Sequence, residues 1–148
     1  MDPAERRQQL LELYERSPIK HTLGVELSYD ESARAVFDMP YRSSFDNAMG
    51  NTHGGILATL LDKAGWFTAA QHYGTWIATA DLHVQLLAPA DRQPLRAVGE
   101  LVRAGRRLAV ATMEVRTADG TLVAIGSGTY AVTTRPFSLA DGGREPLP

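Results

Sequence analysis

The segment 50–65, GNTHGGILATLLDKAG, combines two features that could do chemistry. His53 and a pair of glycines, Gly54 and Gly55, precede an apolar stretch, and Asp62 lies within that stretch. If a helix starts at the glycines, its first backbone N–H groups have no partner in the helix and lie at the positive end of its dipole. Such groups can stabilise charge developing on a carbonyl oxygen, and glycine lets a ligand approach closely. The alternative is that the glycines serve only loop flexibility or tight packing.

Asp62 has leucine, alanine and glycine neighbours, which suggests a buried carboxylate. Burying a carboxylate is costly unless the group is paired or used, so Asp62 is a candidate functional residue. The alternative is that Asp62 and Lys63 form a solvated edge of the helix. Asp62 follows Gly54 by eight positions (62 − 54), a helical rise of about 12 Å. One small carbonyl cannot touch both in one chain, but antiparallel helices of a two-fold dimer can place Gly54 of one chain opposite Asp62 of the other.

Small residues share one line of the expected helix with Asp62. They are Gly55, Ala58, Gly65 and Ala69. A line of small side chains permits close approach, either to a partner chain or to a sheet of the same chain, and the sequence leaves both open.

The elements that must position these residues follow from hydrophobic periodicity. Helical spacing predicts a short helix over residues 4–16, ended by Pro18, and a long helix from His53 to about Tyr73, ended by Gly74. Two strands are expected between these helices, in residues 23–30 and 33–40, followed by a polar loop over residues 41–52.

After Gly74 the period changes to two. In residues 77–90, the set Ala80, Leu82, Val84 and Leu86 alternates with the set Thr79, Asp81, His83 and Gln85. Three further strands are expected in residues 94–105, 106–117 and 121–134. The order of elements predicts an α+β fold with an antiparallel sheet, and the sheet must curl round the long helix because that helix is apolar on more than one face. We expect one domain over residues 1–135 and a loose tail over residues 136–148.

Composition excludes several classes of protein. The 148 residues suffice for one domain with a core, and 44% hydrophobic with 22% charged residues is ordinary for a globular protein. The net charge of −2 gives no basic surface for nucleic acid, and the absence of cysteine excludes disulfides and thiolate sites. No apolar run reaches the roughly 20 residues that span a bilayer, and the polar N-terminus is no signal peptide. We therefore expect a cytoplasmic protein without nucleic-acid or membrane partners.

Residues 47–65, NAMGNTHGGILATLLDKAG, resemble the Asn-x-x-Gly-x-x-His-Gly-Gly…Asp motif of hotdog-fold acyl-CoA thioesterases of the PaaI (phenylacetate-pathway) type. The resemblance continues through TADLHVQLLAPA and RAGRRLAVATMEVRTADGTLVAIGSGTYAV, and covers roughly residues 20–133. It implies a hotdog fold, with a long central helix wrapped by a curved antiparallel sheet of five to six strands. It also implies hydrolysis of acyl-CoA thioesters, with aryl- or phenylacetyl-CoA and medium-chain acyl-CoA as leading substrates.

The resemblance implies roles for individual residues. Gly54 would donate its N–H to the thioester carbonyl, and Asp62 of the partner subunit would act as general base or as nucleophile. Asn47 would orient the thioester or the water, and His53 would support the loop or the thioester. Thr79 falls where relatives often hold the nucleophilic water, although an ordinary strand threonine fits as well.

Substrate-binding residues are expected at both ends of this motif and beyond it. Gly55 belongs to the same helix start as Gly54, and Trp66 with Phe67 could line an acyl pocket or be plain core. The loop containing Gly105, Arg106 and Arg107 could meet the phosphates of CoA or be a solvated hairpin end.

No cofactor is expected beyond the CoA of the substrate, and no metal, because the four histidines lack the usual ligand spacings. The resemblance implies a homodimer with shared active sites that pairs further into a tetramer. Two other functions stay open: a dehydratase or hydratase of acyl thioesters that pairs His53 with Asp62, and a non-catalytic acyl-CoA-binding protein.

Overall fold

The computed structural model describes residues 2–140, which form helices and strands in the predicted order. The elements are α1 (Pro3–Glu15), α2 (Pro18–Leu23), β1 (Glu26–Tyr29), β2 (Ala35–Met39), the short 3-10 helix η1 (Ser43–Phe45), α3 (Gly54–Ala70), β3 (Thr75–Leu86), β4 (Leu95–Ala104), β5 (Leu108–Thr117) and β6 (Leu122–Pro136). No helix within residues 2–140 is both long and apolar enough to cross a bilayer.

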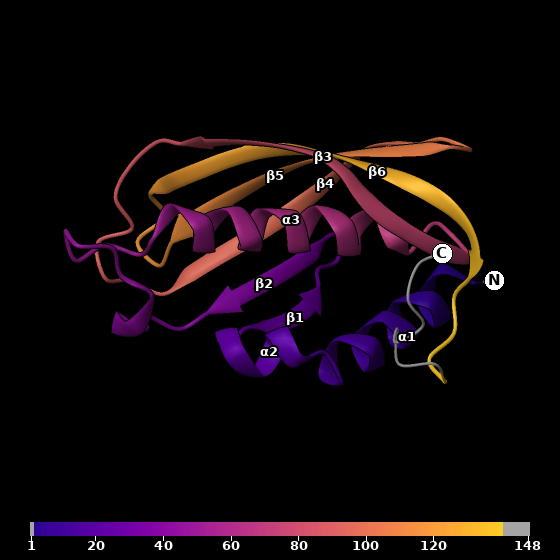
Figure 1. Cartoon of the computed structure of the whole chain (residues 1–148), viewed down its shortest axis with the longest axis horizontal. Coiled ribbons are helices and arrows are strands. Elements are labelled where there is room, and N and C mark those ends of the chain that lie inside the picture. The colour runs from indigo at the N-terminus through magenta and orange to yellow at the C-terminus, as the bar shows by residue number, and fades with distance from the viewer. Residues whose placement is uncertain (1, 141–148) are drawn as a thin grey trace.

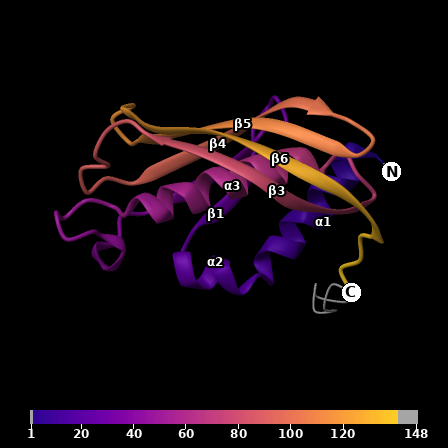
Figure 2. The same ribbon diagram turned by 45° about the horizontal axis from the view of Figure 1, so that its top comes forward.

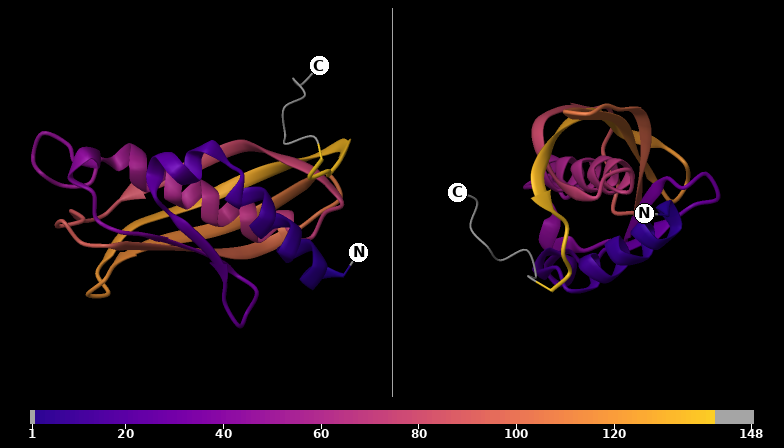
Figure 3. Two further views of the ribbon diagram at one scale, coloured as in Figure 1. Left: turned by 90° about the horizontal axis from the view of Figure 1, so that it is seen from below. Right: turned by 90° about the vertical axis from the view of Figure 1, so that its right-hand side faces the viewer.

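One antiparallel sheet of six strands, in the order β1-β2-β4-β5-β6-β3, curves round α3 (Figure 1). The view along α3 shows the helix enclosed by the sheet (Figure 3), and α3 contacts β2, β3, β4, β5 and β6. This is the hotdog arrangement, and it confirms the predicted α+β class. It also explains why α3 is apolar on more than one face: Leu57, Leu60, Leu61 and Ala64 are all buried.

The N-terminal segment holds two helices where one was predicted. α1 occupies the expected residues, but Pro18 begins α2 as well as following α1. Proline suits the first position of a helix because its missing N–H would have no helical partner there. α1 and α2 lie along the side of the molecule that the sheet leaves open (Figure 2).

α3 ends earlier than predicted, at Ala70 rather than near Tyr73. The Gln71 side chain donates hydrogen bonds to Thr68 O at 3.0 Å and to Ala33 O at 2.7 Å. These bonds tie the end of the helix to the turn between β1 and β2, so a glutamine stops the helix three residues before Gly74.

A β-bulge in β3 changes which residues face the helix. Thr79 pairs with Tyr130 and Asp81 pairs with Thr129, so Ala80 is the extra residue. Before the bulge, Ile77 is buried in the core, and after it the inward-facing residue is Leu82. The predicted single alternation through residues 77–90 is therefore wrong, because the inward face switches from odd to even positions.

The C-terminal segment packs on the body of the protein as far as it is described. Pro136 ends β6, and the Phe137 ring lies 4.7 Å from the Trp76 ring and stacks on the Arg6 guanidinium at 3.5 Å. Most of the predicted tail, residues 141–148, lies outside the described residues.

Candidate active site

The start of α3 leaves one backbone N–H available, that of Gly54. His53 is the N-cap, and its Nδ1 accepts a hydrogen bond from Gly55 N–H at 2.9 Å. Gly54 N–H has no hydrogen-bond acceptor within residues 2–140. A Cβ at Gly54 would lie 2.5 Å from Leu86 Cδ1, so a larger residue here would displace the exposed Leu86 side chain. The predicted helix start at the two glycines is confirmed.

Residues 46–52 form the loop that leads into His53 and positions it as the N-cap of α3. Asn47 N–H donates to Asn51 O at 2.7 Å, and Asn47 Oδ1 accepts from the N–H groups of Met49 and Asn51 at 2.9 and 3.2 Å. The loop is also fastened to the segment after β3, because Arg92 Nε donates to Gly50 O at 3.3 Å. The Asn47 side-chain oxygen thus organises the loop that positions the Gly54 N–H.

Asp62 lies in the third turn of α3, where its side chain meets β3. Thr79 Oγ1 donates a hydrogen bond of 2.9 Å to Asp62 Oδ1, while Oδ2 has no hydrogen bond within the described chain. The bulge after Thr79 turns this side chain toward the helix. The structure therefore brings together two of the residues singled out from the sequence, and it leaves one carboxylate oxygen available.

Burial raises the pKa of Asp62, and the Thr79 hydrogen bond and the nearby Lys63 charge oppose this shift only in part. Lys63 is itself half-buried. Its ammonium lies 4.6 Å from the centroid of the Tyr14 ring and 5.6 Å from that of Phe37, and desolvation lowers the pKa of Lys63 to about 8. The expectation of a solvated Asp62–Lys63 edge is thereby excluded: the two side chains are half-buried and lie against β3 and α1.

Trp66 also joins α3 to β3, one helical turn after Asp62. Its indole Nε1–H donates to Ile77 O at 2.9 Å, and its ring lies 4.9 Å from the Phe67 ring and 6.3 Å from the Trp76 ring. Trp66 is half-buried and lines a cavity, while Phe67 is buried in the core. A role of Trp66 in acyl binding stays a prediction.

The two halves of the line of small residues have different surroundings. A Cβ on Gly65 would lie 2.1 Å from Tyr130 Oη and 2.7 Å from Met113 Sδ, and Ala69 is fully buried. This half of the line packs within the chain. Gly55 is exposed and Ala58 is partly so, which leaves the N-terminal half of α3 accessible.

The Gly105–Arg107 hairpin lies at the opposite end of α3 from Gly54. Tyr73, just beyond the C-terminal end of α3, donates its hydroxyl to Gly105 O at 2.8 Å. Arg106 and Arg107 are exposed. Within one chain these guanidinium groups are therefore remote from the Gly54 N–H.

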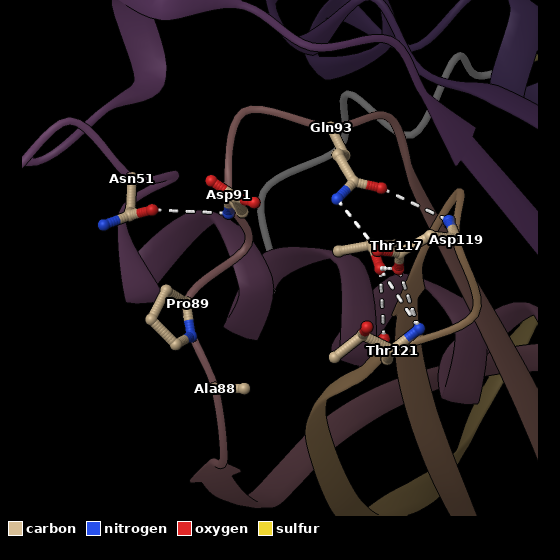
Figure 4. Close-up of a pocket in the computed structure, with 8 residues that line it drawn as sticks. All are labelled: Asn51, Ala88, Pro89, Asp91, Gln93, Thr117, Asp119 and Thr121. Atoms are coloured by element: carbon tan, nitrogen blue, oxygen red, sulfur yellow. Dashed lines mark hydrogen bonds between the residues drawn. The ribbon is translucent and has the colours of Figure 1, made fainter.

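A polar hollow of about 460 Å³ below the 46–52 loop is held together by its own side chains (Figure 4). Asp119 accepts hydrogen bonds from the Thr117 hydroxyl, from Thr121 N–H and from Gln93 Nε2. These bonds, that of Thr117 first, hold the pKa of Asp119 well below its usual range. Because the side chains of Gln93, Thr117 and Asp119 are bonded to one another, we interpret this hollow as a contact between loops.

Nothing at these positions points to a metal. Within residues 2–140, no three His, Asp or Glu side chains are grouped so that they could hold an ion. The groups of the candidate site that could act on a substrate are one backbone N–H donor and one half-buried carboxylate.

Residues 49–124 match the family model of the thioesterase superfamily. The chain belongs to the thioesterase superfamily. The match runs from the 46–52 loop to β6 and includes both Gly54 and Asp62. As a member of this superfamily with the hotdog fold, the chain is a thioester hydrolase.

Curated relatives agree with this membership. The chain is 34% identical over 123 residues to a putative esterase of Halobacterium salinarum, covering 74% of this chain and 81% of that one. It is 29% identical over 132 residues to the medium/long-chain acyl-CoA thioesterase YigI of Escherichia coli, covering 78% and 85%.

Solved structures of similar proteins have the same fold. A Bacillus halodurans protein crystallised with CoA is 28% identical with a TM-score of 0.75, covering 89% of this chain and 91% of that one. The PaaI protein of Escherichia coli is 21% identical with a TM-score of 0.83, covering 93% and 100%. The likeness to PaaI is one of fold, and it confirms the hotdog resemblance.

Sequence reasoning missed three contributors to this site. The bulge at Ala80 has no signal in the alternation, because alanine fits either face. Leu86, which covers Gly54, was assigned only to the sheet. Trp76 was not considered, although its spacing from Trp66 across the turn after α3 could have suggested an aromatic pair.

Proposed function

We propose that the chain hydrolyses acyl-CoA thioesters to the free acid and CoA, with aryl- or phenylacetyl-CoA and medium-chain acyl-CoA as its substrates. The observation that carries the proposal is the Asp62 carboxylate, half-buried, fixed through Oδ1 by Thr79, and with Oδ2 available. The CoA in the Bacillus halodurans neighbour and the acyl-CoA activity named for the YigI relative support this choice of substrate.

In the proposed reaction, the thioester carbonyl oxygen accepts the Gly54 N–H at the positive end of α3. Asp62 Oδ2 takes a proton from water as the water oxygen bonds to the carbonyl carbon. Collapse of the tetrahedral intermediate breaks the carbon–sulfur bond, and the CoA thiolate leaves and receives the proton. One donor and one carboxylate suffice, so the reaction requires no metal or further cofactor.

The two groups come from different chains in this proposal. Gly54 and Asp62 of one chain are separated by about 12 Å of helical rise. β3 is an edge strand of 12 residues that pairs only with β6 within the described chain, and its central residues are exposed. A long exposed edge is a template for strand pairing. Antiparallel pairing of two β3 strands about a two-fold axis would run the two α3 helices antiparallel and bring Gly54 toward Asp62 of the partner subunit.

The same two-fold symmetry suggests a role in substrate binding for the hairpin that carries Arg106 and Arg107. Since Arg106 and Arg107 lie at the far end of α3 from Gly54, a two-fold axis would carry them toward the Gly54 end of the partner. There they could pair with the phosphates of CoA, and Gly55 would let the pantetheine approach the helix start. Asn47 and His53 would position the loop and the Gly54 N–H rather than transfer protons. Pairing of dimers into a tetramer completes the proposed assembly.

The dehydratase alternative is less well supported, because it needs His53 as a proton carrier. His53 Nδ1 is occupied by Gly55 N–H, which gives this side chain a capping role.

The choice between Asp62 as general base and as nucleophile is testable. In a single turnover in H₂¹⁸O, label in the Asp62 carboxylate would show direct attack followed by opening of the mixed anhydride at the Asp62 carbonyl, whereas general-base catalysis would place ¹⁸O only in the acid product.

The proposal is tested by release of free CoA thiol from phenylacetyl-, hydroxybenzoyl-, hexanoyl- and palmitoyl-CoA. Wild type should turn over at least one of them, and Asp62→Asn should not. Mixing Asp62→Asn with Gly54→Pro, each inactive alone, should restore activity if the subunits exchange, because half of the sites in the mixed dimer would hold both intact groups. Full activity of Asp62→Asn would overturn the catalytic assignment, and absence of complementation in demonstrated mixed dimers would overturn the shared site.

A further inference from the structure

The edge strand β3 carries a contact to each of the two groups of the candidate site. Leu86 lies at Gly54, because its Cδ1 is 2.5 Å from the place that a Cβ of Gly54 would take. Thr79 lies at Asp62, because its hydroxyl donates a hydrogen bond of 2.9 Å to Oδ1 of that carboxylate. We call Leu86 and Thr79 the marker residues. Their spacing along β3 limits how a second copy of the strand can pair with it.

The marker residues are an even number of rungs apart in the sheet, a rung being one pair of facing residues on neighbouring strands. Leu86 faces Ala124 of β6, and Thr79 faces Tyr130, so β6 counts six rungs between them (130 − 124). β3 covers the same distance with seven residues (86 − 79), because Ala80 is the extra residue of the bulge. The bulge thus turns an odd spacing in the sequence into an even spacing in the sheet.

An even spacing is what a two-fold axis perpendicular to the sheet requires. Such an axis leaves each side chain on its own face of the sheet, and facing residues of antiparallel strands point to the same face. Because the faces alternate along a strand, a residue can face its own copy or a residue an even number of rungs away. The allowed registers therefore differ by two rungs, a shift of the partner strand by about 7 Å.

The requirement that the two groups of the site meet between chains selects one of these registers. Leu86 must face Thr79 of the partner subunit, and by symmetry Thr79 must face the partner's Leu86. The axis then lies three rungs from each, at the rung of Ser127, which is midway between 124 and 130, and the residue of β3 on that rung is His83. The neighbouring registers would separate the two groups by a further 7 Å or so, which one thioester carbonyl cannot bridge.

Resting on the proposed function, we propose that β3 binds β3 of a second copy of this chain with His83 on the two-fold axis, facing His83 of the partner subunit. Within the described chain β3 pairs only with β6, so its other edge is available. In this register Asp81 faces Gln85 of the partner subunit, and Leu82 faces the partner's Val84. Asp81, His83 and Gln85 are exposed, whereas Leu82 and Val84 pack against the core. The joined sheet therefore keeps its apolar face toward the two helices.

This register gives the bulge at Ala80 a role in assembly. If β3 were regular over the seven positions from Thr79 to Leu86, these positions would be seven rungs, and the marker residues would point to opposite faces. No pairing about a two-fold axis would then bring them together. The bulge therefore serves the contact between chains as well as the contact of Thr79 with Asp62.

Single cysteines test the register, because the chain has no cysteine of its own. His83→Cys should form a disulfide-linked dimer under mild oxidation, since facing Cα atoms of antiparallel strands are about 4.5–5.5 Å apart, within disulfide range. Asp81→Cys and Gln85→Cys are the matched controls. Each lies four rungs from its own copy (85 − 81), so neither should be linked alone. Coexpressed, these two should be linked to each other, with a yield roughly five times that of either alone.

Other registers would give other products. A shift by two rungs would link Asp81→Cys to His83→Cys, or His83→Cys to Gln85→Cys, in preference to the His83→Cys homodimer. Either product, or a wild-type chain that sediments as a monomer, would overturn the proposal. All three substitutions replace exposed side chains, and a circular dichroism spectrum like that of wild type would show that each variant folds.

The crosslinks do not depend on hydrolysis, so they separate this proposal from the proposed function. If His83→Cys is linked but no thioester is cleaved, the register holds and the proposed function fails. If thioesters are cleaved but His83→Cys is not linked, the register fails and the proposed function holds. If both hold, the oxidised His83→Cys dimer should hydrolyse thioesters as fast as its reduced form, because the disulfide then joins chains that are already in the active register.

Discussion

The Thr79 hydroxyl lies 2.9 Å from Asp62 Oδ1 and donates to it, which joins the edge strand β3 to the central helix α3. The hydroxyl does two things at once. It fixes one oxygen of the carboxylate, and it partly offsets the increase in pKa that burial causes. The position of the Asp62 carboxylate and its protonation state therefore depend on one side chain of an edge strand.

Removing this hydroxyl should change the pH dependence of hydrolysis. Thr79→Val deletes a bond that stabilises the ionised carboxylate, so the pKa of Asp62 should rise further and the acid limb of kcat/KM should move to higher pH. Activity at neutral pH should fall about tenfold, which corresponds to one hydrogen bond to a charged group. Thr79→Ser, which keeps the hydroxyl, is the matched control. Identical pH profiles for the two variants would contradict this coupling.

The ionised Asp62 side chain should lower the stability of the folded protein at pH 7. Because burial raises its pKa, the folded chain holds the Asp62 proton more tightly than the unfolded chain, so ionisation above the ordinary pKa of 3.8 destabilises the fold. Asp62→Asn should therefore lose 10²–10⁴ in kcat, the usual range for an acid–base group, and melt at a higher temperature at pH 7. The gain in Tm should vanish as the pH falls to about the ordinary aspartate pKa. A lower Tm at pH 7 would be the contrary result.

The Gly54 N–H can be deleted without changing the helix start. Proline is well suited to the first helical position, and the φ of −58° and ψ of 138° at His53 are values that a residue before proline readily adopts. Gly54→Pro should lower kcat by about 10²–10³, as for other oxyanion donors. Gly54→Ala also adds a Cβ near Leu86 but keeps the N–H, so it controls for the steric effect. Equal loss in both variants would assign the effect to packing.

Lys63 should make the stability of the fold rise at alkaline pH. Desolvation lowers its pKa from 10.5 to about 8, so the folded chain releases this proton before the unfolded chain does. Its protonated form opposes folding below about pH 8, and this opposition fades between about pH 8 and 10.5. Lys63→Met should raise the Tm at pH 7, and the difference from wild type should narrow across that interval. Lys20→Met, at a lysine paired with Glu15 and Glu26, should give no such gain at pH 7.

Much of the fold could be predicted from the sequence because burial imposes periodicity on it. The apolar body of α3 indicated an enclosed helix, and the strands of the sheet showed their period of two. The end of α3 and the start of α2 could not be predicted in the same way. Each depends on one residue, Gln71 or Pro18, whose effect is set by its surroundings.

The candidate site was partly predictable for a similar reason. Local features, namely the two glycines at a helix start and a carboxylate among leucines, identified Gly54 and Asp62. The contact between Asp62 and Thr79 was out of reach of periodicity alone, since alternation placed Thr79 on the face opposite Leu82. The resemblance to the hotdog thioesterases did single out Thr79. The bulge places Thr79 on the same face as Leu82, so Thr79 can contact Asp62 although the alternation predicts the opposite face.

The bulge at Ala80 places Thr79 and Leu82, three positions apart in the sequence, on one face of β3. Deleting Ala80 would regularise the ladder with β6 and leave Thr79 and Leu82 two positions apart, still on the face that meets α3. The face that a residue of β3 presents is therefore set by its partner on β6 and not by whether its number is odd or even.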